Sequence, residues 1–210
     1  MNLSVMPSYG RTDIAFERGD GPYLFSDDGR KFLDFGAGIA VTALGHNHPK
    51  LVTALTEQAG KLWHTSNHYN ITLQQRLADR LVANSFADTV FFCNSGAESV
   101  EASIKLMRKY HSASGNPERY RIISFEGSFH GRTLATVAAG ANDAHRAGFG
   151  PTVDCFDHVA FCNINEVNIV TKMLCCPHRR NKTKSRGINI TSSNSFPKII
   201  KSHKSRSTSR

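Results

Sequence analysis

The sequence predicts an α/β fold built on a parallel sheet, and two adjoining patterns support this. Residues 89–93 are a short apolar run without alternation, which is typical of a strand buried on both faces. A turn at 94–96 leads into an apolar stripe at helical spacing over 97–111, and a second strand-like run follows at 121–125. Another helix is expected to begin near Gly131. Alternating strands and helices in this order indicate parallel strands joined by helices.

The first part of the chain predicts a hairpin followed by two helices. Apolar runs at 22–26 and 31–35 flank Asp27-Asp28-Gly29-Arg30, a turn sequence typical of β-hairpins. Proline suits a first helical position, so Pro49 is expected to begin a helix. The apolar residues at helical spacing in the two helices are Leu51, Leu55, Ala59 and Leu62, then Leu73, Leu77 and Leu81.

The charge is distributed unevenly along the chain. Residues 1–170 carry 15 Lys/Arg and 17 Asp/Glu, whereas residues 171–210 carry 11 Lys/Arg and no acid. The last residues are also rich in serine and poor in apolar side chains, which predicts disorder. We therefore expect an N-terminal segment with the hairpin over 1–60, a sheet domain over 61–168, and a basic tail over 169–210.

The basic tail leaves a non-enzymatic function open. Eleven positive charges would attract polyanions such as nucleic acid or an anionic membrane. The tail has one aromatic residue, Phe196, and therefore offers little for base stacking, so specific nucleic-acid recognition is not expected. The five cysteines show no disulfide framework, and we find neither a signal peptide nor a membrane span. These features predict a cytoplasmic protein.

Two histidine- or cysteine-containing motifs could suggest a metal. His46 and His48 are two residues apart and lack an evident third ligand. Cys175-Cys176-Pro177-His178 has adjacent cysteines and no second half-site. We therefore expect no metal centre.

The strongest candidate site lies at 92–98, where the predicted strand ends and a helix begins. Ser95 can cap the helix with Glu98 three residues later, and Gly96 lets a ligand approach the backbone. Unpaired N–H groups and the helix dipole would then hold a phosphate. The alternative is a capped helix that binds nothing.

A second candidate site, Ser128-Phe129-His130-Gly131-Arg132-Thr133, also follows a strand. Arg132 could bind a carboxylate, Phe129 could stack on a planar ring, and His130 could titrate near neutral pH. In the alternative, Arg132 is a surface residue, Phe129 is core and His130 caps the turn. A third polar and aromatic cluster at 64–69 could equally be a plain connection between helices.

Taken together in this order, the motifs resemble the class-III aminotransferases of fold type I, and within them the acetylornithine aminotransferase branch. The run at 62–67 favours that branch. The motifs that carry the resemblance are Leu33-Asp34-Phe35, Gly38-Ile39-Ala40-Val41, Leu44-Gly45-His46-Asn47-His48-Pro49, Leu62-Trp63-His64-Thr65-Ser66-Asn67, Phe92-Cys93-Asn94-Ser95-Gly96-Ala97-Glu98 and Ser128-Phe129-His130-Gly131-Arg132-Thr133.

This resemblance implies an incomplete fold-type-I transferase that uses pyridoxal 5′-phosphate (PLP) as cofactor. Ser95, Gly96 and Ala97 would hold the cofactor phosphate, and Phe129 would pack on the pyridine ring. Arg132 would pair with the substrate α-carboxylate, and Tyr9 would lie near the substrate. His68 departs from the family, which often has leucine there.

The resemblance also implies a homodimer that transfers the amino group of N-acetylornithine to 2-oxoglutarate in arginine biosynthesis. Ornithine and 4-aminobutyrate are the alternative amino donors. The family's Schiff-base lysine and its carboxylate on the pyridine nitrogen have no match here, so we expect no catalytic lysine and no activity from the chain alone. We interpret the change near Asn168 as a truncation caused by a frameshift or by a mis-joined gene.

Overall fold

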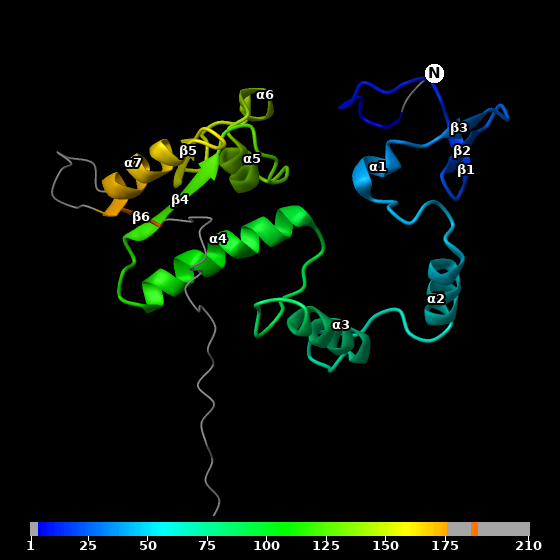
Figure 1. Cartoon of the computed structure of the whole chain (residues 1–210), viewed down its shortest axis with the longest axis horizontal. Coiled ribbons are helices and arrows are strands. Elements are labelled where there is room, and N and C mark those ends of the chain that lie inside the picture. The colour runs from blue at the N-terminus through cyan, green and yellow to red at the C-terminus, as the bar shows by residue number, and fades with distance from the viewer. Residues whose placement is uncertain (1–3, 176–185, 189–210) are drawn as a thin grey trace, which may run out of the picture. The chain divides into compact units, whose positions relative to one another are not determined.

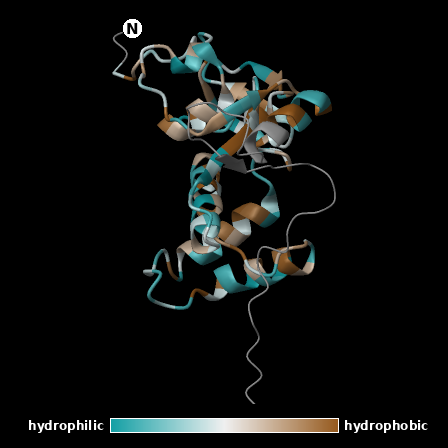
Figure 2. Ribbon diagram, turned by 90° about the vertical axis from the view of Figure 1, so that its left-hand side faces the viewer, coloured by the Kyte–Doolittle hydropathy of each residue, from teal (hydrophilic) through white to brown (hydrophobic). Residues whose placement is uncertain are grey.

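The computed structural model describes residues 4–175 and 186–188 of the 210-residue chain (Figure 1). The chain forms two compact units, Met1–Thr72 and Leu73–Arg210, which we call unit 1 and unit 2. In the described residues no helix is long and apolar enough to cross a membrane. Figure 2 agrees, since its helices carry both hydrophobic and hydrophilic segments.

Unit 1 contains a three-stranded antiparallel sheet in the order β1-β2-β3. Its elements are β1 (Phe16–Asp20), β2 (Tyr23–Ser26), β3 (Lys31–Leu33), the short turn α1 (Ala37–Ala40) and the helix α2 (Pro49–Ala59). The predicted hairpin is confirmed as β2 and β3, which pair antiparallel across a turn where Gly29 has φ +86°. Strand β1 was not predicted, because its sequence FERGD shows no alternation of apolar residues. The helix expected from Pro49 is confirmed with proline at its start.

The segment α1 is a single turn of left-handed helix. Its residues Ala37, Gly38, Ile39 and Ala40 have φ values of 45°, 60°, 61° and 63°. Left-handed backbone costs L-residues about 1–2 kcal/mol each, and a β-branched residue such as Ile39 is rare there. The surrounding structure must therefore hold this turn in place.

Asp34 is the residue that holds the left-handed turn. Its Oδ1 accepts hydrogen bonds from the backbone N–H of Gly36 and Ala37, both at 2.9 Å. Its Oδ2 lies 2.8 Å from Nε2 of His46. The His46 contact, followed by the Ala37 N–H, lowers the pKa of Asp34 below its usual value. The His46 ring in turn packs so closely on Gly19 that a Cβ there would lie 2.5 Å from it.

We predict that Ala40→Gly stabilises unit 1 by about 0.5–1 kcal/mol, because glycine removes a left-handed penalty larger than its own entropy cost. Ala54→Gly is the matched control, since exposed Ala54 lies in right-handed α2, and it should destabilise by about 1 kcal/mol. Amide hydrogen exchange across unit 1 measures both changes. Destabilisation by both variants would contradict the left-handed assignment.

Unit 2 contains a three-stranded sheet in the order β5-β4-β6, in which both strand pairs are parallel. This confirms the predicted parallel α/β arrangement, and the helix expected from Leu73, Leu77 and Leu81 is confirmed as α3. The elements are α3 (Thr72–Ala83), α4 (Gly96–Ala113), β4 (Arg119–Phe125), α5 (Leu134–Gly140), α6 (Asp143–Arg146), β5 (Phe156–Val159), α7 (Ile164–Cys175) and β6 (Arg186–Ile188).

The sheet of unit 2 is covered on both faces. On one face, Ile123 and Val159 form a buried cluster with Val167 of α7. On the other face, β4 contacts α4 and α5, and His158 Nε2 lies 2.9 Å from the carbonyl of Ala138 in α5. Figure 1 shows α7 and α4 on opposite sides of β4. After the carboxyl end of β4, the chain continues into the loop that precedes α5.

Two expectations about secondary structure were wrong. Residues 89–93 form no strand, and Phe91 is 79% exposed, because the segment pairs with no strand among the described residues. The helix expected near Gly131 is confirmed as α5, which begins at Leu134. Regular structure also continues past Asn168, since α7 ends at Cys175 and Arg186–Ile188 pairs with β4. The rest of the predicted tail lies outside the described residues, and the predicted domain ranges stay predictions.

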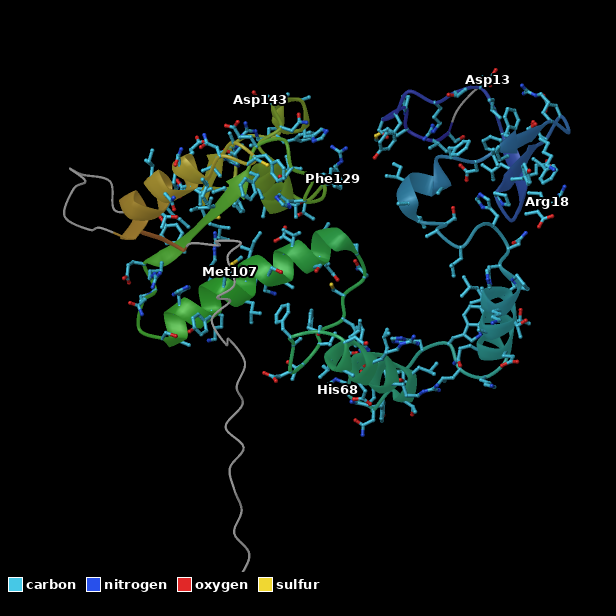
Figure 3. All side chains as sticks on the ribbon, viewed as in Figure 1. Asp13, Arg18, His68, Met107, Phe129 and Asp143 are labelled. Carbon is cyan, nitrogen blue, oxygen red and sulfur yellow. The ribbon has the colours of Figure 1, made fainter. Side chains whose placement is uncertain are left out.

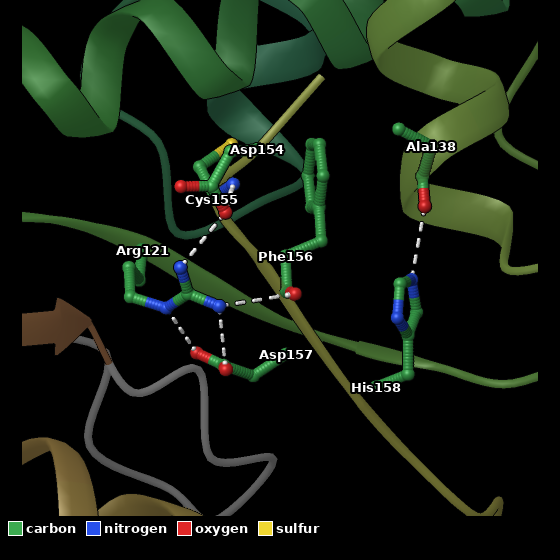
Figure 4. A network of polar contacts seen from close by, with 7 residues as sticks. All are labelled: Arg121, Ala138, Asp154, Cys155, Phe156, Asp157 and His158. Atoms are coloured by element: carbon green, nitrogen blue, oxygen red, sulfur yellow. Dashed lines mark hydrogen bonds and ion pairs between the residues drawn. The ribbon is translucent and has the colours of Figure 1, made fainter. Parts of the chain in front are cut away.

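Arg121 joins β4 to the residues around β5 (Figure 4). Its Nη2 and Nε donate to the two carboxylate oxygens of Asp157 at 2.7 and 2.9 Å, and its Nη1 donates to Asp154 at 2.9 Å. The Arg121 side chain is 13% exposed, that of Asp157 21% and that of Asp154 77%. The contact with Asp157 raises the pKa of Arg121, and the contact with Arg121 lowers the pKa of Asp154.

We predict that Arg121→Met destabilises unit 2 by about 2 kcal/mol, because it leaves the half-buried Asp157 without its bidentate partner. Asp154→Asn, which removes the exposed contact, should cost less than about 1 kcal/mol. Urea unfolding followed by circular dichroism measures both. If the two variants lost equal stability, burial of Asp157 would not explain why the network is stabilising.

Candidate functional site

The beginning of α4 is capped much as the sequence predicted. Ser95 is extended, with φ −156°, and its Oγ accepts a hydrogen bond from the N–H of Glu98 at 3.2 Å. The Glu98 carboxylate accepts from the N–H of Asn94 at 2.9 Å, one residue before the position of a standard capping box. These bonds fix where the long helix α4 begins.

Capping leaves two backbone N–H groups at this end available to a ligand. The N–H groups of Gly96 and Ala97 form no hydrogen bond within the part of the chain that the structure describes. A Cβ built on Gly96 would meet nothing within 4 Å, so the space beside it is open. Helix N-termini carry partial positive charge and bind phosphates through such groups. The geometry therefore fits a phosphate.

The second candidate site is the loop between β4 and α5. Phe129 is 68% exposed, so the alternative that made it a core residue is wrong. The guanidinium carbon of Arg132 lies 5.2 Å from the centroid of the Phe129 ring, within cation–π range. Figure 3 shows Phe129 beside α5. One exposed aromatic ring and one exposed cation are thus presented together by this loop.

The structure brings the two candidate sites together. A Cβ on Gly131 would lie 2.7 Å from Cβ of Ala97 and 2.8 Å from Oγ1 of Thr136, which shows how closely the loop packs on α4. In addition, the Thr133 hydroxyl donates a hydrogen bond to the Glu101 carboxylate of α4. Sequence analysis missed these contacts. The repeat Thr133-x-x-Thr136 before an apolar run was the available signal.

Tyr9, His46 and His48 lie in unit 1. Tyr9 is 67% exposed there. His46 is engaged with Asp34, and Nδ1 of His48 is buried without a hydrogen-bond partner. Among residues 4–175 and 186–188, no group of three or more potential ligands could hold a metal. Cys175 ends α7, and Cys176 to His178 lie outside the described residues.

The profile of the family "Aminotransferase class-III" matches residues 5–183 of this chain. The chain belongs to the class-III aminotransferases. Its relatives include the acetylornithine aminotransferases of Mesorhizobium japonicum, 56% identical over 77% of this chain and 41% of the relative, and of Brucella melitensis, 56% identical over 73% and 38%. The chain therefore spans about two fifths of the length of the curated relatives it matches.

Solved aminotransferases share the fold. The ornithine aminotransferase of Toxoplasma gondii matches with a TM-score of 0.77 at 23% identity, over 80% of this chain and 40% of that one. A thermostable omega transaminase from Pseudomonas jessenii matches with a TM-score of 0.69 at 27% identity, over 75% and 37%. The chain thus has part of the fold-type-I architecture, as predicted, and PLP is the cofactor of this family. PLP partly occupies the active site in a second structure of the Toxoplasma enzyme.

We predict that Gly131→Ala destabilises unit 2 by about 2 kcal/mol, because its new methyl group would overlap Ala97 and Thr136 at a positive φ of 131°. Gly96→Ala is the matched control and should cost no stability, since its methyl group enters open space. Urea unfolding followed by circular dichroism compares the two. Equal stability of both variants would contradict the close packing of the loop on α4.

Proposed function

We propose that this chain forms the phosphate- and carboxylate-binding part of an acetylornithine-type aminotransferase. The whole protein would transfer the amino group of N-acetylornithine to 2-oxoglutarate. The observation that carries this proposal is the contact between Gly131 and Ala97, which places the Phe129 and Arg132 loop against the beginning of α4.

The residues that are present fit PLP. When bound, PLP acts as the electron sink for amino-group transfer. The N–H groups of Gly96 and Ala97 would bind its phosphate, with Ser95 alongside. Phe129 would pack on its ring, and Arg132 would pair with the α-carboxylate of the substrate through two parallel hydrogen bonds. The guanidinium must then leave the face of Phe129, which it covers in this structure.

The choice of acetylornithine as amino donor rests on the relatives. Proteins named acetylornithine aminotransferase are 56% identical to this chain in Mesorhizobium japonicum and 52% identical in Agrobacterium fabrum. The ornithine aminotransferase likeness, at 23% identity, supports the fold alone. A role in arginine biosynthesis and a cytoplasmic location belong to the same proposal, as does Tyr9 near the substrate.

We further propose that the whole protein is a homodimer. Large apolar side chains are exposed in each unit considered by itself, including Phe35 at 91%, Ile39 at 95%, Trp63 at 86% and Phe91 at 79%. Exposed apolar surface of this kind is typical of an interface. In the whole protein, this surface would be covered by the parts of the fold that the chain does not span and by a second subunit.

We predict that the purified chain binds PLP at least about tenfold more tightly than pyridoxal, because only PLP has a phosphate for the N-terminus of α4. Ser95→Ala should weaken PLP binding several-fold, since it loosens the first turn. Ser103→Ala, a control further along α4, should leave it unchanged. Isothermal titration calorimetry measures all three. Equal affinity for PLP and pyridoxal would contradict the phosphate site.

A separate prediction concerns turnover. Because no lysine here has the family's surrounding residues, the purified chain should not turn over N-acetylornithine. Borohydride reduction with PLP, followed by mass mapping, should label no single lysine. One uniquely labelled lysine together with steady turnover would refute this expectation.

A further inference from the structure

Thr133 lies at the centre of a small hydrogen-bond network that connects the loop between β4 and α5 with α5 and α4. Its N–H donates to Oγ1 of Thr136 at 2.9 Å, and the Thr136 hydroxyl lies 3.0 Å from the Thr133 carbonyl. Thr136 itself is completely buried. These two bonds fix the start of α5. The Thr133 hydroxyl donates to Glu101 of α4, and its oxygen also caps α5, since it accepts from the backbone N–H of Thr136 and lies 2.9 Å from Oγ1 of Thr136.

The loop therefore touches α4 at two points one turn apart. Gly131 packs on Ala97, in the first turn of α4, and Thr133 bonds to Glu101 four residues later. Residues four apart lie on the same face of a helix. Contact at one point would let the loop pivot about Gly131, whereas contact at two points fixes its direction along α4.

We propose that Thr133 and Glu101 are positioning residues for cofactor and substrate binding. Their hydrogen bond holds the Phe129 and Arg132 loop at a fixed place relative to the N–H groups of Gly96 and Ala97. A ligand that spans both sites depends on this bond, and a ligand that uses only the N-terminus of α4 does not. The inference rests on the proposed function for the identity of that ligand.

The test compares PLP with inorganic phosphate on the full 210-residue chain. Thr133→Val removes the hydroxyl, with its contacts to both Glu101 and Thr136, at nearly constant volume and should weaken PLP binding by at least about tenfold, the loss expected for one hydrogen bond to a charged group. Binding of inorganic phosphate should not change. Thr133→Ser restores the hydroxyl and should restore PLP affinity. Glu101→Ala removes only the contact with α4 and should weaken PLP binding by about tenfold, and the double variant should lose no more than Thr133→Val alone.

Equal weakening of PLP and phosphate binding by Thr133→Val would overturn the proposal, as would failure of Thr133→Ser to restore affinity. Unchanged PLP affinity in Thr133→Val would overturn it as well.

Hydrogen exchange separates this inference from the proposed function. In Thr133→Val, the amide of residue 133, which donates to Oγ1 of Thr136, should exchange at least about tenfold faster, while the amides of β4 and β5 keep their rates. If the unaltered chain binds neither ligand, the proposed function fails, and the exchange result still decides whether Thr133 holds the loop. Unchanged exchange in the loop, or faster exchange throughout unit 2, would overturn the positioning role.

Discussion

The candidate site depends on one steric constraint, the close approach of Gly131 to Ala97. Gly131 leaves no room for a side chain, because a Cβ there would lie 2.7 Å from Cβ of Ala97 and 3.0 Å from its Cα. This contact converts two separate local features, a capped helix and a loop after a strand, into a single surface. Without it, the N-terminus of α4 would be a plain helix end and Arg132 an ordinary surface cation.

Local features of the fold were predictable from the sequence, and features that depend on distant partners were not. The turn at Gly29, the start of α2 at Pro49 and the cap at Ser95 follow from nearby residue types and were found where expected. Residues 89–93 have strong strand propensity, yet they remain unpaired among the described residues, because a strand exists only where another strand accepts its hydrogen bonds. The sequence therefore shows the strand propensity of residues 89–93 but not which strand they would pair with.

The same division applies to the candidate site. The residues expected to face a ligand, Ser95, Gly96, Phe129 and Arg132, stand at helix or loop positions that the sequence could identify. The residues that connect them, Glu101 and Thr136, lie on helical faces with no distinguishing local pattern beyond the Thr133 repeat. Their contribution depends on α4 and α5 packing on one sheet, which is a property of the tertiary fold.

The left-handed turn at Ala37–Ala40 has a consequence for the order in which unit 1 folds. An isolated segment of this sequence would wind the other way, because right-handed backbone is favoured for L-residues. The turn becomes stable only when Asp34 meets His46, twelve residues further along the chain. That meeting requires β3 to be paired and the His46 loop to be seated on Gly19. We therefore expect the turn to form only after β3 and the His46 loop are in place.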